Sequence, residues 1–370
     1  MKSAPTFNRS GWPNSTVSVR NVTPAAKKPA KSSSRRYILL LGAILLVVVA
    51  WSGAWVYGRS VLSAQLDKQM TRMAEGGLEI SCAGLAVAGY PFRYEVGCTQ
   101  MRSRDRRGTD AELDGLNAVA LVYNPWHVIF EASAPARVAV PATGLSGNIA
   151  WETARASVKF SREALDEVNA VVRKPRAAFE NAFSAGTASA EKAEVHLRAT
   201  PADSAALDGY FSVDALKLES LPELQETLDM KARIQVSGGT ALLAGADLVS
   251  LVRINGGDLP VRLELFEAAL GRSRVGASGD LIVNGDGTLT GDLELTVGNA
   301  KELLQSLEPL FPPKNQSFAL MQSVVDSLAP MAGNVDGVAS ITLPVKIDRG
   351  VASVGFLPLG RIPALFPGGM

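Results

Sequence analysis

The chain has 370 residues and a net charge of +1 that is unevenly distributed. Its first 36 residues carry eight Lys and Arg and no acidic side chain, so the remainder carries 1 − 8 = −7. An acidic body argues against nucleic acid as a partner, since phosphate binding needs clustered cations on the folded domain. Aromatic residues make up 6% of the chain, which leaves few stacking surfaces for sugars or bases.

Residues 1–36 are rich in Ser, Pro, Asn and Lys and poor in aliphatic side chains. Such a segment cannot bury enough apolar surface to fold, so we expect a disordered basic cytoplasmic tail. Two roles are open for it. It either lies near anionic lipid headgroups or serves as an orientation signal and nothing more, and the second is the simpler interpretation.

Tyr37 to Tyr57 is a 21-residue run without a charged side chain. A helix rises about 1.5 Å per residue, so the run matches a hydrocarbon core of roughly 30 Å. We predict a transmembrane helix over residues 37–58, with the N-terminus cytoplasmic and the body periplasmic because of the basic residues before it. A cleaved signal peptide is the alternative, and Arg35-Arg36 fits a twin-arginine signal. The length of the run and the lack of an A-x-A site favour an uncleaved inner-membrane anchor.

Residues 59–77 follow the apolar run, have apolar positions at helical spacing and end at Gly76-Gly77. This pattern predicts a short helical stalk between the membrane segment and the body.

Cys82 and Cys98 are the two cysteines of the chain. They are placed symmetrically about Tyr90, so a hairpin that turns there sets the two sulfurs opposite each other. An extracytoplasmic location supplies the oxidant, and we predict a disulfide worth about 3 kcal/mol. A redox or metal pair is the alternative, but it lacks C-x-x-C spacing and a nearby His. The turn motif between the cysteines consists of Gly89, Tyr90, Pro91 and Phe92.

From Leu78 onward, the dominant period of apolar residues is two. Segments 194–199, 261–265, 292–297 and 340–347 alternate apolar and polar side chains. Alternation of this kind is typical of antiparallel strands with one apolar and one solvated face. Turn sequences at 284–287 and 348–350 predict hairpins.

Helical spacing of apolar residues recurs in the body. It predicts a helix over 162–183 that is interrupted at Pro175, a helix capped by Asn299, a helix over 316–328, and a shorter one after Ser220. We therefore expect an α+β, mainly β fold for residues 78–370. It would be a large curved antiparallel sheet with a few helices packed on its apolar face, preceded by one N-terminal transmembrane helix.

The sequence offers no catalytic residue, metal ligand or cofactor-binding motif that we can identify. His127 and His196 have no second His or Cys at metal spacing, and His196 falls on the polar side of its strand. The start of a calcium loop at Asn284-x-Asp286 has Leu289 in place of the required Gly, so a β-turn is the better interpretation.

Three segments resemble an uncharacterised family of bacterial envelope proteins, domain of unknown function 2125. They are Gly89-Tyr90-Pro91-Phe92-Arg93 with a Cys on either side, Val122 to Ile129, and Gly355 to Pro363. The resemblance covers residues 40–366 and implies an N-terminal anchor and a β-rich exported body, without a known activity. The strand pattern is also similar, more distantly, to AsmA-like proteins, whose curved sheets carry lipid along an apolar groove.

Three functions follow as hypotheses. The first is a non-enzymatic envelope protein that binds or guides lipid or another amphiphile on an apolar sheet face left uncovered by the helices. In the alternative, those helices and the folding of the sheet on itself cover the apolar face completely, and no binding surface is left. The second is a scaffold for other membrane or envelope proteins that uses exposed strand edges. An enzyme is third, because it would need a polar cleft that the sequence does not reveal.

Overall fold

The computed structural model describes residues 34–366, except for 107, 142, 162–163, 182–183, 244, 312–315 and 336. The predicted tail over residues 1–36 therefore lies almost wholly outside the described residues. The chain divides into two units, residues 1–52 and 53–370.

One helix, α1, covers Ser34–Glu75 without a break, including the segments predicted as membrane helix and stalk. It is the one helix among the described residues that is long and apolar enough to cross a membrane. Gly77 ends it in the left-handed region with φ +89°, where a residue with a Cβ would be strained.

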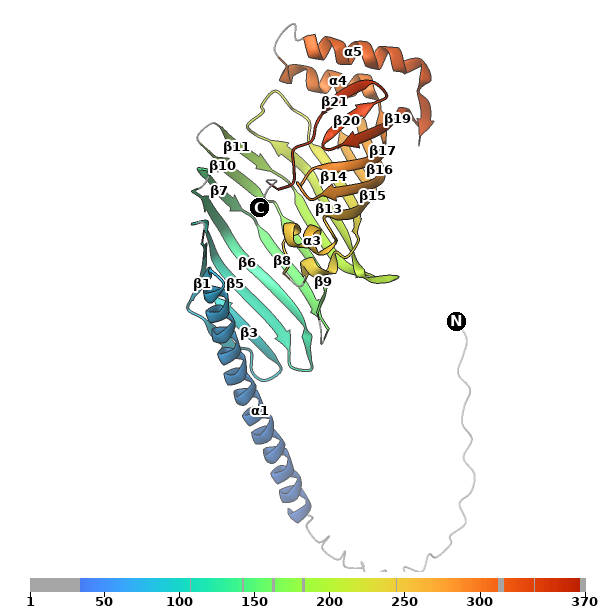
Figure 1. Ribbon diagram of the computed structural model, residues 1–370. Coiled ribbons are helices and arrows are strands. Elements are labelled where there is room, and N and C mark those ends of the chain that lie inside the picture. The colour runs from blue at the N-terminus through green and yellow to red at the C-terminus, as the bar shows by residue number, and fades with distance from the viewer. Residues whose placement is uncertain are drawn as a thin grey trace, which may run out of the picture. The chain divides into compact units, whose positions relative to one another are not determined.

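The body is built on one antiparallel sheet, which contains 21 strands within the described residues (Figure 1). The strands are β1 Leu78–Ala83, β2 Ala86–Ala88, β3 Arg93–Cys98, β4 Gln100–Asp105, β5 Asp110–Leu121, β6 Asn124–Val140, β7 Leu145–Ala150, β8 Thr153–Phe160, β9 Leu165–Arg173, β10 Arg176–Glu180, β11 Ala185–Ser189, β12 Lys192–Thr200, β13 Asp203–Leu218, β14 Leu228–Val236, β15 Asp258–Leu270, β16 Ser273–Asn284, β17 Leu289–Gly298, β18 Gly333–Val335, β19 Val338–Asp348, β20 Val351–Val354 and β21 Leu357–Arg361. The mainly β fold and the large antiparallel sheet are confirmed.

One continuous path across the sheet follows the order β2, β3, β5, β6, β8, β9, β12, β13, β14, β15, β16, β17, β19, β20 and β21. Strands β4, β7, β10 and β11 pair with one another or with β5, β6 and β13 farther along the same strands. The two predicted hairpins are present. They join β16 to β17 and β19 to β20.

The helix predicted over 162–183 is wrong in its described residues, which form β9 and β10. Val168, Val171 and Val172 are β-branched, and stiff χ1 angles favour a strand. Lys174 precedes Pro175, which disfavours helical backbone at that point. The short helix predicted after Ser220 is also wrong, because residues 221–227 form a turn and a bend before β14 begins.

The helices predicted after Asn299 and over 316–328 are confirmed as α4 (Ala300–Leu307) and α5 (Gln316–Leu328). Asn299 itself does not cap α4 with its side chain. Its backbone is left-handed, and its Nδ2 donates instead to the carbonyl oxygen of Arg272 at 2.9 Å.

Two helices that the sequence analysis missed, α2 (Thr240–Leu243) and α3 (Leu248–Ile254), lie beside the strands in Figure 1. Asp247 caps α3, because its carboxylate accepts from the backbone N–H of Ser250 at 2.7 Å. That hydrogen bond lowers the pKa of the Asp247 carboxyl. A cap residue before an apolar run that ends at Gly256-Gly257 is the signal that could have revealed this helix.

The main buried core lies where α2 and α3 meet the sheet. Leu251 of α3 is 0% exposed, and Leu259 at the start of β15 is also 0% exposed. The cluster consists of Leu207, Val236, Leu243, Leu251, Val252, Leu259 and Val283. These two short helices therefore bury the strand ends of β13 to β16 that lie beside them, rather than the whole sheet.

Cys82 and Cys98 are joined as a disulfide, with their Cα atoms 5.5 Å apart. The single hairpin that we expected to bring them together is wrong. Cys82 belongs to β1 and pairs with Met101 of β4, whereas Cys98 belongs to β3 and pairs with Leu116 of β5. The chain breaks the expected ladder after β1, where Gly84 has φ +63°, so the bond links two separate strand pairs.

We expect Leu251→Ala to lower the free energy of unfolding by about 2–5 kcal/mol, because it leaves a cavity in the fully buried part of α3. Ile254→Ala is the matched control on the same helix, where the side chain is 71% exposed, and should change stability by less than about 0.5 kcal/mol. Urea unfolding of the detergent-solubilised full chain measures both. Equal effects would contradict the assigned core.

Candidate functional site

One face of the sheet carries an unbroken apolar surface, which follows from strand register. Side chains two apart in a strand share a face, and paired residues of adjacent strands lie side by side. The middle row of this surface crosses twelve strands, from β3 to β19. It consists of Val96, Ala118, Phe130, Ala156, Ala170, Val195, Phe211, Ala232, Phe266, Ala277, Leu295 and Leu343.

A row on each side of the middle row is apolar as well. The first consists of Tyr94, Ala120, Val128, Val158, Val168, Leu197, Gly209, Ile234, Leu263, Gly279, Leu293 and Val345. The second consists of Cys98, Leu116, Ala132, Ala154, Val172, Ala193, Val213, Met230, Ala268, Val275, Val297 and Ile341. We call the three rows together the apolar sheet face. It carries no charged residue.

Burial differs between the apolar sheet face and the core. Val168, Leu197 and Ile234 in the first row pack against the α2–α3 core. Every member of the middle row is only half-buried, except Phe211, which is 37% exposed. Helices α2 and α3 thus cover one border of the face, and its middle row stays partly accessible.

The opposite face is polar, and its charges are paired across the strands. Arg155 lies 3.1 Å from Glu131, Lys231 lies 3.0 Å from Glu267, and Arg262 lies 2.9 Å from Asp280. Exposed pairs of this kind contribute little to stability. These charged side chains favour contact of this face with water, whereas the apolar sheet face favours contact with apolar groups.

The two histidines lie on the polar side as ordinary strand residues. The Nδ1 atom of His196 is 2.7 Å from the Oδ1 atom of Asn169, and its ring lies 5.7 Å from that of Tyr210. The Nε2 atom of His127 is 2.7 Å from the Oγ atom of Ser157 on β8. His127 lies inside β6, near the start of that strand. No group of three or more metal-ligating side chains occurs in the described part of the chain.

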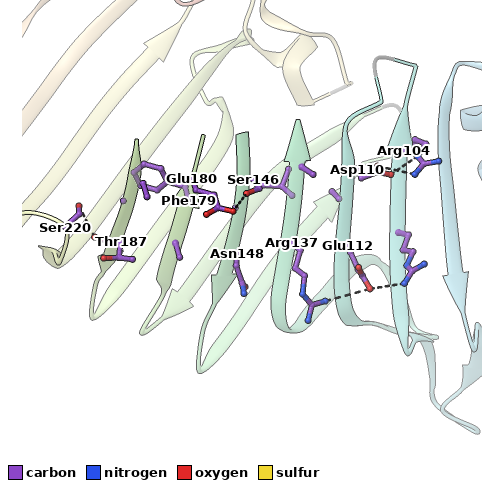
Figure 2. A pocket seen from close by; sticks show the side chains of 18 residues that line it. Arg104, Asp110, Glu112, Arg137, Ser146, Asn148, Phe179, Glu180, Thr187 and Ser220 are labelled. Carbon is purple, nitrogen blue, oxygen red and sulfur yellow. Dashed lines mark hydrogen bonds and ion pairs between the residues drawn. The ribbon is translucent and has the colours of Figure 1, made fainter. Parts of the chain in front are cut away.

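A depression of about 970 Å³, lined by apolar side chains as well as by ion pairs, lies over β4 to β7, β10 and β11 (Figure 2). Arg104 binds Asp110 at 2.7 Å, and Arg102 binds Glu112 at 3.2 Å. The hydrogen bond from Arg104 lowers the pKa of the Asp110 carboxyl. Because these cations and carboxylates neutralise one another, the depression has the character of an ion-paired surface rather than of an acid–base site.

The predicted turn motif joins β2 to β3. Gly89 has φ +97°, and the backbone N–H of Arg93 donates to its carbonyl oxygen at 3.1 Å. Tyr90 packs edge-on against Trp55 of α1, with ring centroids 5.5 Å apart. Tyr94 stacks on the same indole at 5.7 Å. Trp55 also donates its Nε1 proton to the carbonyl oxygen of Arg93 at 3.1 Å, so this turn holds the helix to the sheet.

A family model described as "Uncharacterized protein conserved in bacteria (DUF2125)" matches residues 55–363. The chain belongs to the DUF2125 family. No curated protein matches it, and no solved structure does. The DUF2125 match begins at Trp55, the residue that joins α1 to the turn motif, and runs through β21. The distant likeness to AsmA-like proteins stays a prediction.

On the polar face, the Lys159 ammonium lies 2.6 Å from the Glu167 carboxylate and, with the Asn169 amide, lowers the pKa of Glu167. A lowered folded-state pKa adds stability that is present above the unfolded value, about 4.3, and is lost as the pH falls through the folded value. We expect Glu167→Gln to lack this part of the acid dependence. Unfolding free energies measured from pH about 6 down to about 3 test it.

Lys159→Met should weaken the same acid dependence, because it removes the larger cause of the shift. Parallel pH curves for the natural chain and both variants would contradict the assigned pairing.

Proposed function

We propose that this DUF2125 protein is a single-pass inner-membrane protein whose exported body binds or guides lipid, or another amphiphile, along the apolar sheet face. One observation carries the proposal: an apolar row crosses twelve strands, and none of its members is buried. Soluble proteins rarely leave a contiguous apolar surface of this extent without a ligand or partner.

The dimensions suit an acyl chain. Neighbouring strands are about 4.8 Å apart, so twelve strands give a path of roughly 50 Å, which is longer than one lipid chain. Large and small side chains mix along the middle row, where Ala118 and Ala156 flank Phe130. The three rows present no charge to a headgroup, so we expect selection by the apolar part of the ligand.

The proposed location rests on charge and redox chemistry. Eight basic residues precede the apolar helix, and the positive-inside rule assigns them to the cytoplasm. The disulfide between Cys82 and Cys98 fits an oxidising compartment such as the periplasm. We take the function to be non-enzymatic, since the carboxylates of the polar face are paired with cations rather than poised as acid and base.

A scaffold for membrane or envelope proteins is the second candidate. It is favoured by β21, which is exposed at all five positions, and by Phe356 just before it, which is fully exposed. An exposed strand of this kind can pair with a strand of another chain.

Photo-crosslinking can separate the two candidates. A benzophenone amino acid placed at Phe130 points from the apolar sheet face, and one placed at the adjacent Ile129 points from the opposite face, where Ile129 is 49% exposed. We expect irradiation of cells that make the full chain to attach lipid at position 130 and not at position 129. Mass spectrometry of the purified adduct is the measurement.

A discrete protein adduct at position 130 would favour the scaffold. Lipid adducts in equal yield at both positions would overturn the proposal, because they would report general contact with membrane rather than binding on one face.

A further inference from the structure

Four large aromatic side chains are exposed at one end of the sheet, in two neighbouring turns. Tyr90 and Phe92 belong to the β2–β3 turn and are 52% and 61% exposed. Tyr123 lies in the β5–β6 turn, and Trp126 follows it at the start of β6; they are 76% and 51% exposed. We call these four residues the aromatic rim. Rings of this size in contact with water cost free energy unless something apolar receives them.

The two turns lie side by side. Arg93 of β3 pairs with Leu121 of β5, and the backbone N–H of Val122 donates to the carbonyl oxygen of Phe92 at 3.0 Å. Leu121 in turn pairs with Asn124 of β6. The aromatic rim is therefore one continuous patch.

The rim is held at a fixed level on α1. Trp55 contacts Tyr90 and Tyr94, and its side chain is 7% exposed. Gly58, one turn later, approaches Tyr94 so closely that an added Cβ would collide with its hydroxyl. In the sequence, Trp55 stands three positions before the end of the 37–58 segment, about 4.5 Å along the helix axis.

The contacts of Trp55 and Gly58 hold the aromatic rim next to the last turn of the apolar run of α1. The apolar run of α1 ends beside it, and exposed Arg59 follows, a cation of the kind that lipid phosphates attract. Tyr and Trp combine an apolar ring with a polar edge, and they are enriched at the boundary between headgroups and acyl chains.

We propose that the aromatic rim inserts into the outer-leaflet interface of the same membrane that α1 crosses, which makes it a second contact of the body with lipid. Trp126 also lies at alternate positions with Val128 and Phe130. The rim would thus be the point where the bilayer meets the apolar sheet face. The inference rests on the proposed membrane anchoring but not on lipid binding by that face.

The test uses the full chain reconstituted in vesicles of phosphatidylethanolamine and phosphatidylglycerol. Some of these lipids carry bromine near the headgroup end of the acyl chain. Bromine quenches indole fluorescence on contact. The Trp126 signal is the emission of the natural chain minus that of Trp126→Phe. The control is the Trp151 signal, which is the emission of the natural chain minus that of Trp151→Phe. Trp151 is held within the sheet, where its indole N–H donates to the carbonyl oxygen of Ala132. We expect loss of the Trp126 signal in brominated vesicles and retention of the Trp151 signal.

Flotation of the vesicles after alkaline washing separates failure of the anchor from failure of the rim. Protein that does not float would overturn the membrane anchoring on which the inference rests. Protein that floats, but whose Trp126 signal is unaffected by bromine and fully quenched by aqueous acrylamide, would overturn the rim alone. Equal loss of the Trp126 and Trp151 signals would also overturn it, because quenching would then report no preferred contact.

Discussion

Strand alternation combined with register is the constraint on which the rest of this structure depends. Each strand alone separates apolar from polar side chains, but only the pairing of twelve strands in consistent register joins the apolar sets into one surface. A slip of one residue between β12 and β13 would place His196 opposite apolar neighbours and expose Val195 on the charged side. The paired charges of the polar face oppose such a slip, since they would lose their partners.

The second determinant is how little of that surface the helices cover. The two helices α2 and α3 together contain eleven residues, and they bury a compact cluster centred on Leu251 and Leu259. The middle row, with Phe130 and Phe211, lies beyond their reach and stays half-buried or exposed. A sealed core would be expected to contribute stability and little else, whereas a partly open apolar surface calls for a ligand or partner.

The body is also attached to its helix in a defined way. The indole of Trp55 stacks on Tyr94 and donates to the carbonyl oxygen of Arg93, and the lack of a side chain at Gly58 allows the helix to approach. The end of the segment predicted as the membrane helix, just before the predicted stalk, is thus fastened to the sheet. The turn motif at Tyr90 therefore does two things: it connects β2 to β3, and it binds α1 through Trp55.

The sequence by itself determined the apolar helix, the strands with period two and the two glycine-containing hairpins, because each depends on local composition or spacing. Three of its segments also carried the resemblance to the DUF2125 family. The sequence failed for the 162–183 segment, where helical spacing coincided with β-branched residues, and for the path between Cys82 and Cys98. Only the tertiary structure decided which strands pair, since the partner of β1 is β4 rather than its chain neighbour. Openness of the apolar sheet face was likewise undetermined, because burial depends on distant helices and not on the strands that carry the apolar side chains.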